Sequence, residues 1–277
     1  MIKKALLALV VVALTLSART ARAAEKSDPK TDLQGLVLKI KDKLKEDKKT
    51  EKDLEDDLKQ FDVLLEKYKG QKTDEVAEIL FMKALLYLEV LDNTEKGLEF
   101  IKQLKSDFPE TTRGKGADNI IASAQKQENA KKIQKSLVVG ATFPDFEEKD
   151  TAGKPLSVAN HKGKVVLIDF WATWCGPCVA ELPNVLKTYE TYHGKGFEIV
   201  GISLDRDEQA LTTFTKKRTM AWQQFFDGKG WENKLAEKYG IQSIPATFLL
   251  DGEGKIVARD LRGEALGAQV AKMLEKP

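Results

Sequence analysis

Residues 164–170 form an apolar segment without the alternation of a half-exposed strand, which predicts a strand buried on both faces of a sheet. A helical segment at 177–192 follows it, and a second buried strand is expected at 197–202. The other expected elements are short strands around Phe146 and Leu156, a helix after Asp205, a hairpin at 246–250 and 255–258, and a helix from Glu264. This order predicts an α/β fold, a mixed sheet flanked by helices.

The region before this sheet has a different pattern, because it is rich in lysine and glutamate and lacks strand-like alternation. Breaks near Gly70, Asn93 and Pro109 favour several antiparallel helices, an all-α helical-hairpin domain, over one long coiled coil. Apolar residues recur there at helical spacing; they are Leu33, Leu36, Ile40, Leu44, Leu54, Leu58, Phe61, Leu65, Val76, Leu80, Ala84 and Leu88.

One stretch of this helical region resembles a tetratricopeptide repeat. Leu85 departs from the motif, since it stands where the family prefers glycine. The resemblance implies either a groove that binds a partner or a helical scaffold that packs on its neighbour. The matching large, small and terminal proline positions are Phe81, Ala84, Leu88, Gly97, Ile101, Leu104 and Pro109.

The first 23 residues have the pattern of a secretory signal peptide. Lys3 and Lys4 form a positive segment, residues 5–16 are apolar, and residues 21–23 supply a small-residue cleavage site. The apolar run is short for a membrane span, which needs about 20 residues; retention as an uncleaved anchor is the alternative. We therefore expect a periplasmic or secreted protein.

The expected domain plan follows from these segments. It comprises a signal peptide at 1–23, a polar linker at 24–30, the α-helical domain at 31–136 and the α/β domain at 137–277. Acidic and basic residues are nearly balanced, 43 against 45, with a net charge of +2. This balance gives no reason to expect nucleic acid or an anionic membrane surface as a partner.

Only two cysteines occur in the chain, Cys175 and Cys178, separated by Gly176 and Pro177. Two sulfurs at this spacing can open and close one disulfide, and such chemistry moves electrons between thiols. Cys175 is expected at the N-terminus of the following helix, where unpaired N–H groups and the helix dipole favour a thiolate. Pro177 suits the first helical turn. Cys178 is expected to be more buried and to attack the mixed disulfide formed by Cys175.

Three other uses of the cysteine pair compete with thiol–disulfide exchange. A zinc site would need His161 and His193 as further ligands, and their spacing does not match one. An inert disulfide would close too small a loop to contribute much entropy. Peroxide reduction is disfavoured by Ile168 and Ala172, which stand where peroxiredoxins carry proline and threonine. We expect no cofactor and no metal.

Asp169 lies within the buried strand, where an unpaired carboxylate has a raised pKa or a large free-energy cost. It is either a general base that takes the proton from Cys178, through water, or a satisfied hydrogen-bonding partner. Glu181, one turn beyond Cys178, either tunes thiol acidity or is a solvated helix residue.

Pro245 precedes a predicted strand, a position where a cis peptide bond is tolerated. If the bond is cis, the Ile244 backbone can pair with an extended substrate segment. Trp174 would then supply apolar surface for substrate beside Gly176 and Pro177, with plain packing as the alternative. For Trp171 packing is the favoured interpretation.

These residues together resemble the thioredoxin superfamily, and several motifs resemble its extracytoplasmic TlpA/ResA-like branch. The resemblance implies a thioredoxin fold with Cys175 as nucleophile, Cys178 as resolving thiol and a cis Pro245 beside them. Many members of this branch carry asparagine at the position of Asp169, and the family's glutamate near the active site matches Glu181. The motifs are FWATWCGPC at 170–178, CVAELP at 178–183, GISLD at 201–205 and PATFLLD at 245–251.

The predicted function is an extracytoplasmic thiol–disulfide oxidoreductase that exchanges disulfides with protein cysteines. Because Gly176 and Pro177 offer no cation or histidine to stabilise a thiolate, we expect a reductant. A reductant outside the cytoplasm needs a membrane thiol donor as a partner. Two alternatives stand beside this one: a docking module recruited through the helical domain, and a specialised reductant in cytochrome c maturation.

Overall fold

The computed structural model describes residues 27–275, and these divide into two compact units between Glu128 and Asn129. This division falls inside one helix, α7 (Ala117–Ser136), whereas the predicted domain boundary lies at the end of that helix. The signal-peptide prediction at 1–23 and the first part of the predicted linker lie outside the described residues. Within the described part of the chain, no helix is long and apolar enough to cross a membrane.

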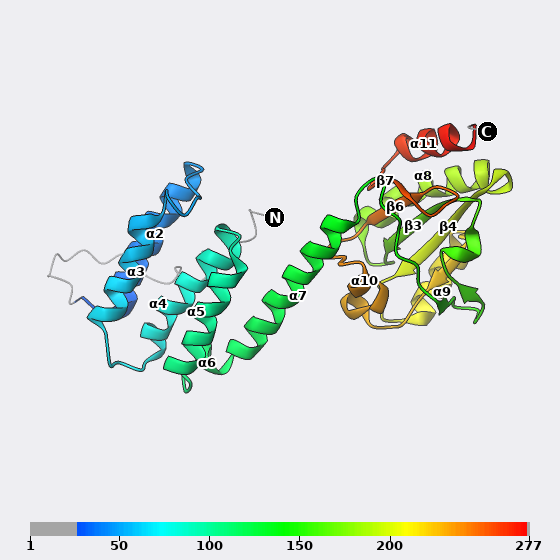
Figure 1. Cartoon of the computed structure of the whole chain (residues 1–277). Coiled ribbons are helices and arrows are strands. Elements are labelled where there is room, and N and C mark those ends of the chain that lie inside the picture. Colours follow the sequence, from blue (N-terminus) through cyan, green and yellow to red (C-terminus); the bar gives the residue numbers. More distant parts are fainter. Residues whose placement is uncertain (1–26, 276–277) are drawn as a thin grey trace, which may run out of the picture. The chain divides into compact units, whose positions relative to one another are not determined.

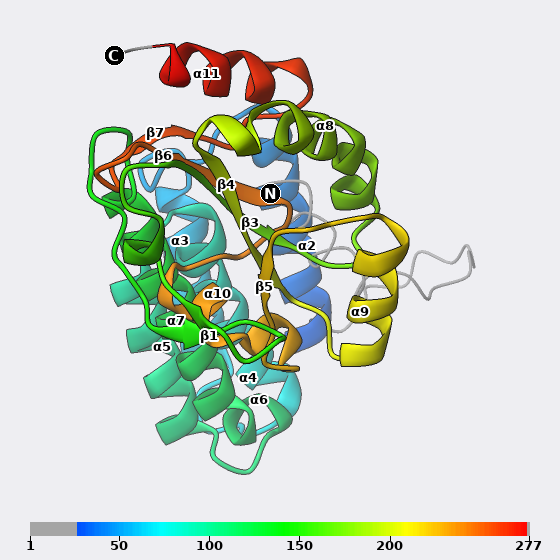
Figure 2. The same cartoon turned by 90° about the vertical axis from the view of Figure 1, so that its right-hand side faces the viewer.

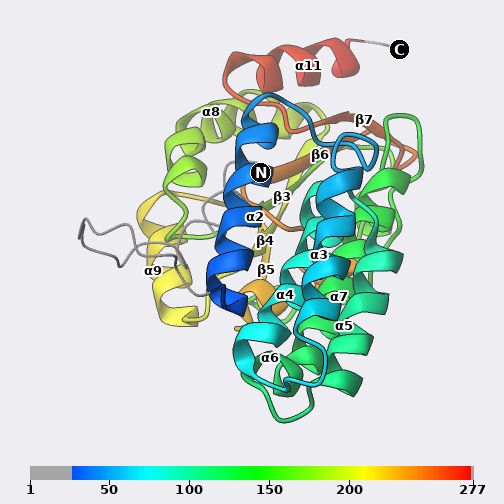
Figure 3. The ribbon, with the colours of Figure 1, turned by 90° about the vertical axis from the view of Figure 1, so that its left-hand side faces the viewer.

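The first unit is helical, and its helices lie side by side in Figure 3. The expected breaks near Gly70, Asn93 and Pro109 are confirmed, and a further break at 46–54 separates the first two helices. Most of the predicted apolar positions are buried in the core, including Phe61, whereas Leu44, Leu65 and Leu88 are only partly buried. The core also contains residues outside that pattern, such as Leu64 and Ile79. The helices are α2 (Pro29–Lys45), α3 (Glu55–Lys67), α4 (Asp74–Leu85) continued by the π-turn η1 (Leu86–Val90), α5 (Thr94–Asp107) and α6 (Thr112–Lys115).

The α4–α5 pair contains the stretch that resembles a tetratricopeptide repeat. Gly97 is placed so close to Leu88 that a Cβ at this position would lie 2.5 Å from the Leu88 side chain. Any larger residue would push the two helices apart, so glycine at this position permits their close approach. The hairpin is observed, while its use as a partner-binding groove stays a prediction.

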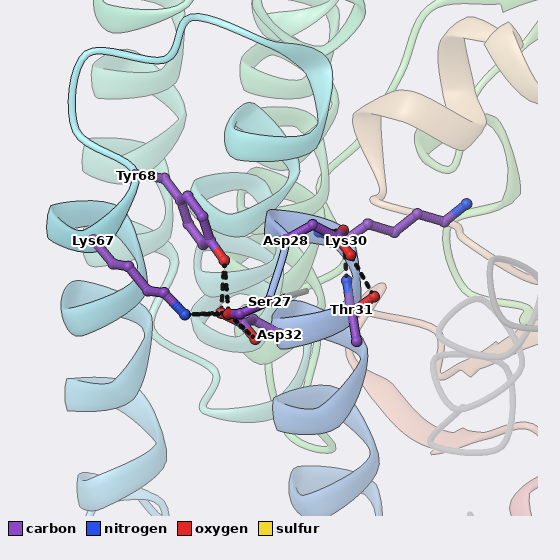
Figure 4. Close-up of polar contacts among 7 residues, drawn as sticks. All are labelled: Ser27, Asp28, Lys30, Thr31, Asp32, Lys67 and Tyr68. Carbon is purple, nitrogen blue, oxygen red and sulfur yellow. Dashed lines mark hydrogen bonds and ion pairs between the residues drawn. The ribbon is translucent and has the colours of Figure 1, made fainter. Parts of the chain in front are cut away.

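The start of α2 is fixed to the end of α3 by polar contacts (Figure 4). Asp28 caps the helix, its carboxylate accepting from the backbone N–H groups of Lys30 and Thr31 at 3.0 and 3.1 Å. Asp32 accepts from Lys67 Nζ at 2.6 Å and from the Tyr68 hydroxyl at 2.8 Å. These bonds lower the pKa of Asp32, so the ion pair favours its charged form.

The second unit is built on a five-stranded sheet of order β5-β4-β3-β6-β7 (Figure 2). β3 is central, parallel to β4 and antiparallel to β6. β4 and β5 are parallel, and β6 and β7 antiparallel. The strands are β3 (Val165–Trp171), β4 (Phe197–Ser203), β5 (Gln223–Phe225), β6 (Ala246–Leu250) and β7 (Ile256–Arg259), and a separate small hairpin joins β1 (Glu148–Lys149) to β2 (Pro155–Leu156).

Helices cover both faces of this sheet, α8 and α11 on one side and α10 on the other (Figure 1). The predicted mixed sheet flanked by helices, preceded by an all-α region, is confirmed. β5 was not expected, since it has only three residues and two are glutamine. The helices are α8 (Gly176–Tyr192), α9 (Glu208–Lys217), α10 (Lys234–Lys238) and α11 (Glu264–Leu274), with 3-10 turns η2 (Ala159–His161), η3 (His193–Lys195) and η4 (Gly230–Glu232).

The last turn of α7 belongs to the second unit and is bound to β7. Arg259 donates to the carbonyls of Gln134 at 3.2 Å and Leu137 at 2.8 Å. Gln134 also donates to the carbonyl of Tyr239 at 2.6 Å. The two Arg259 bonds satisfy backbone acceptors at the end of α7, and the Gln134 bond satisfies the carbonyl of the residue that caps α10.

Candidate active site

Cys175 and Cys178 form a disulfide at the N-terminus of α8, directly after the loop that leaves β3. Cys175 is the N-cap residue, and its Sγ accepts a hydrogen bond from the Cys178 N–H at 3.3 Å. The free N–H groups of a helix terminus and its dipole favour negative charge at this sulfur. The geometry therefore stabilises a thiolate at Cys175 when the bond is reduced.

The expected difference in burial between the two cysteines is wrong for this disulfide form. Cys175 is 6% exposed and Cys178 is 7% exposed. Both cysteines belong to one cluster of buried residues in this form, so the disulfide as a whole is shielded from solvent.

The loop before the cysteines is held by a carboxylate that the sequence did not single out as a site residue. The buried Asp205 accepts from the Thr173 N–H at 3.1 Å and from the Thr173 hydroxyl at 2.6 Å. Asp205 itself is held by the Ser203 hydroxyl, which donates at 2.7 Å. This network fixes the backbone directly before Trp174 and Cys175.

A cavity of about 20 Å³ lies behind the disulfide, and Asp169 and Cys178 both line it. This volume is enough for one water molecule, which needs roughly 10–15 Å³. Asp169 is the one position of β3 that is not fully buried. Its neighbours around the cavity include Glu181, Pro245 and Arg262.

The Asp169 carboxyl group is strongly perturbed. Burial raises its pKa to about 7, Arg262 lowers it, and Glu181 raises it. Among residues 27–275, none donates a hydrogen bond to this carboxylate. A carboxyl that titrates near neutral pH beside a thiol can accept and return a proton.

Glu181 faces the same cavity and is tied to the loop before α11. Its Oε1 accepts from the Gly263 N–H at 2.6 Å and from Asn184 Nδ2 at 3.3 Å. Gly263 has φ +57° and ψ −138°, a conformation that L side chains rarely adopt. Glu181 is thus held by two hydrogen bonds at the edge of the cavity, and its effect on thiol acidity stays a prediction.

The Ile244–Pro245 peptide bond is cis, and the Pro245 carbonyl accepts from Arg262 at 2.8 Å. The same guanidinium donates to the Thr247 hydroxyl at 3.1 Å. Arg262 thereby connects the segment around the cis proline to the cavity that contains Asp169. No local pattern in the sequence pointed to Arg262, because its acceptors lie 15 and 17 positions earlier.

Three of the predicted substrate-facing residues adjoin the cysteines in the sequence, and the fourth, Ile244, precedes Pro245, which lines the cavity with Cys178. Trp174 is exposed, Gly176 and Pro177 begin α8, and Ile244 is half-buried against the core. Trp171 is buried and donates from Nε1 to Gln224 at 3.0 Å, in agreement with its interpretation as a packing residue.

The two histidines lie apart from the cysteines. His161 is buried in η2, where burial lowers its pKa. His193 lies 3.5 Å from Glu198. Across the described residues, no group of three or more His, Cys, Asp or Glu side chains is arranged to hold a metal.

A buried strand, a disulfide at a helix N-terminus, a perturbed carboxyl and a cis proline define a thioredoxin-like protein. Residues 138–274 match the Redoxin family. The chain is 32% identical over 143 residues to the thiol-disulfide oxidoreductase ResA of Bacillus thuringiensis subsp. konkukian, covering 52% of this chain and 80% of that one. It belongs to the TlpA/ResA-like family of thiol-disulfide oxidoreductases.

Other similar proteins carry related names. The thiol-disulfide oxidoreductase ResA of Bacillus subtilis is 32% identical over 124 residues, which cover 45% of this chain and 68% of that one. The thioredoxin domain of a thiol-disulfide oxidoreductase from Bacteroides vulgatus is 38% identical with a TM-score of 0.47, covering 50% of this chain and 100% of that domain.

Proposed function

We propose that the protein is an extracytoplasmic reductant of protein disulfides, with Cys175 as its nucleophile. The observation that carries this is the Cys175 Sγ at the head of α8, 3.3 Å from the Cys178 N–H. The same N–H and helix dipole stabilise a thiolate there after reduction. Exchange with protein thiols is supported by the family to which the chain belongs.

The reaction transfers two electrons to the substrate. The Cys175 thiolate attacks one sulfur of the substrate disulfide, forming a mixed disulfide and releasing the other sulfur as a thiolate. Cys178 then attacks the Cys175 sulfur, releases the second substrate thiolate and forms the intramolecular disulfide. The enzyme is oxidised by two electrons and the substrate is reduced by two.

Asp169 is the proposed base in the second step. Cys178 must lose its proton before it attacks, and both residues line the same cavity, which has room for one water molecule. Because burial raises the pKa of Asp169 to about 7, this carboxyl can take that proton near neutral pH. Arg262 and Glu181 set the charge around it and act as positioning residues.

The reducing direction rests on the dipeptide between the cysteines. Gly176 and Pro177 add no cation that would favour the reduced form, so the potential should lie nearer thioredoxin, about −270 mV, than DsbA, about −120 mV. Equilibration with glutathione buffers measures it, and a value above roughly −160 mV would contradict the proposal. Continued turnover outside the cytoplasm would require a membrane thiol donor, and that location rests on residues 1–23.

Insulin reduction with dithiothreitol as recycling reductant tests the activity. Wild type should accelerate insulin reduction, Cys175→Ser should have no activity above background, and Cys178→Ser should accumulate a mixed disulfide. Equal, thiol-independent behaviour of wild type and Cys175→Ser would favour a docking module instead. The proteins trapped by Cys178→Ser in cells would identify clients, and haem-binding apoproteins among them would favour the cytochrome c alternative.

A further inference from the structure

A second exposed tryptophan lies beside the one that precedes the disulfide. Trp174 is 54% exposed and Trp231, in η4, is 43% exposed, and their ring centroids are 6.1 Å apart. A single exposed apolar residue is ordinary, but adjoining large apolar side chains mark contact surfaces. No local sequence pattern marks Trp231 as a neighbour of Trp174, because the two residues lie 57 positions apart in the chain.

Hydrogen bonds from residues on both sides of it in the sequence fix the turn that carries Trp231. Asn233 is fully buried and donates to the Ser203 carbonyl at 3.2 Å and to Asp227 Oδ1 at 3.1 Å. Asp227 also accepts from the backbone N–H groups of Lys229 at 3.0 Å and Lys234 at 2.9 Å. The turn is therefore closed on itself and fixed to the end of β4.

Ser203, at the end of β4, also fixes the segment that carries Trp174. Ser203 donates to Asp205, and Asp205 accepts from the backbone N–H and the hydroxyl of Thr173, directly before Trp174. One buried polar network, centred on Ser203, thus holds both segments that carry the exposed indoles. Side chains presented by fixed backbone lose little conformational entropy when a partner binds.

We propose that Trp174 and Trp231 form a preorganised indole platform that binds apolar side chains flanking the target cysteine of a partner polypeptide. The inference rests on the proposed function, since a sulfur that reaches Cys175 brings its neighbouring residues across Trp174. Trp231 extends the apolar surface beyond Trp174 and selects for apolar flanking residues. Stacking and burial of apolar groups on the indoles supply the preference.

Two disulfide-linked peptide dimers of equal length test this, one with leucine on both sides of its cysteine and one with serine. With dithiothreitol recycling, wild type should reduce the leucine-flanked dimer with a kcat/KM about tenfold higher. Trp231→Ala should bring this ratio to within about twofold by slowing the leucine-flanked peptide alone. Trp231→Phe should keep most of the preference, because the aromatic surface remains.

Val139→Ala is the matched control, since Val139 is an exposed apolar residue of the same unit and should leave the ratio unchanged. If Trp231→Ala unfolds, Trp231→Gln replaces it. No preference in wild type, a ratio unchanged by loss of Trp231, or equal slowing of both peptides would overturn the platform. Absence of any reduction by wild type would instead overturn the proposed function itself.

Discussion

Each unit of the molecule places an aspartate carboxyl in its interior, fully buried at Asp57 and partly buried at Asp169. The surroundings of the two carboxyls shift their pKa values in opposite directions. Asp57 in α3 lies 3.0 Å from Lys39 Nζ and 2.6 Å from Lys43 Nζ. Burial would raise its pKa, but hydrogen bonds from Lys43 and Lys39 outweigh burial and lower it. Asp169 in β3 receives no such donors from the described residues, and its pKa is raised to about 7.

This difference in pKa distinguishes a carboxylate that stabilises the fold from one that can exchange a proton near neutral pH. A paired carboxylate stays ionised and stabilises the fold around it, as Asp57 does between α2 and α3. An unpaired one in a cavity costs stability when ionised, and its titration near neutral pH makes it useful beside a thiol. The contrast can be tested at both sites.

The largest effect should be a change in the pH dependence of stability. Folding raises the pKa of Asp169, so this carboxyl stabilises the folded state only while it is protonated. Its contribution to the free energy of unfolding is fully present below about pH 4 and is lost as the pH rises through 7. Asp169→Asn removes this loss, so its stability relative to wild type should grow by about 2–3 kcal/mol between pH 5 and pH 8. Urea unfolding of both oxidised proteins measures this, and parallel pH curves would contradict it. The same variant should reduce insulin more slowly at neutral pH.

The next effect should appear at Asp57. Asp57→Ala removes the acceptor for two lysines, so unfolding should become easier by about 2 kcal/mol. The insulin-reduction rate of the folded protein should not change. The exposed neighbour Asp56 gives the matched control, Asp56→Ala, which should alter neither quantity. A fall in activity with Asp57→Ala would show that the division into structural and chemical carboxylates is wrong.

A smaller shift is expected when the cation near Asp169 is lost. Arg262 lowers the pKa of Asp169, so Arg262→Gln should move the pH midpoint of insulin reduction upward by about one unit. Arg262→Lys retains the charge and should restore much of the midpoint. A midpoint that falls in Arg262→Gln, or does not move, would remove Arg262 from this role.

The smallest shift should come from Glu181, which raises the pKa of Asp169. Its carboxylate already accepts from the Gly263 N–H at 2.6 Å, which offsets part of its charge. Glu181→Gln should therefore lower the same midpoint by only about half a unit. The pH profile of insulin reduction measures it, with Glu190→Gln as a control on an exposed position of the same helix. An upward shift would contradict the sign.

The sequence was sufficient where local pattern decides structure. The apolar run of β3, the helix after the cysteines and the helical spacing around Phe61 predicted their elements, because burial imposes a period on each. The residues that complete the site are far from their partners in the sequence. Asp205 binds Thr173 across 32 positions, and Asn233 binds Ser203 across 30, so no local pattern could show these pairs.

The bond between β7 and the end of α7 decides where this chain can be shortened. A piece that began at residue 138, where the family match starts, would lose Gln134 and Leu137 and leave the guanidinium of Arg259 without both carbonyl acceptors. It would also remove Ala130, which packs against Gly240 so closely that a Cβ there would lie 2.6 Å from its carbonyl oxygen. A fragment that contains only the second unit should therefore begin at Asn129 or earlier. It then keeps the last part of α7, which lies outside the family match.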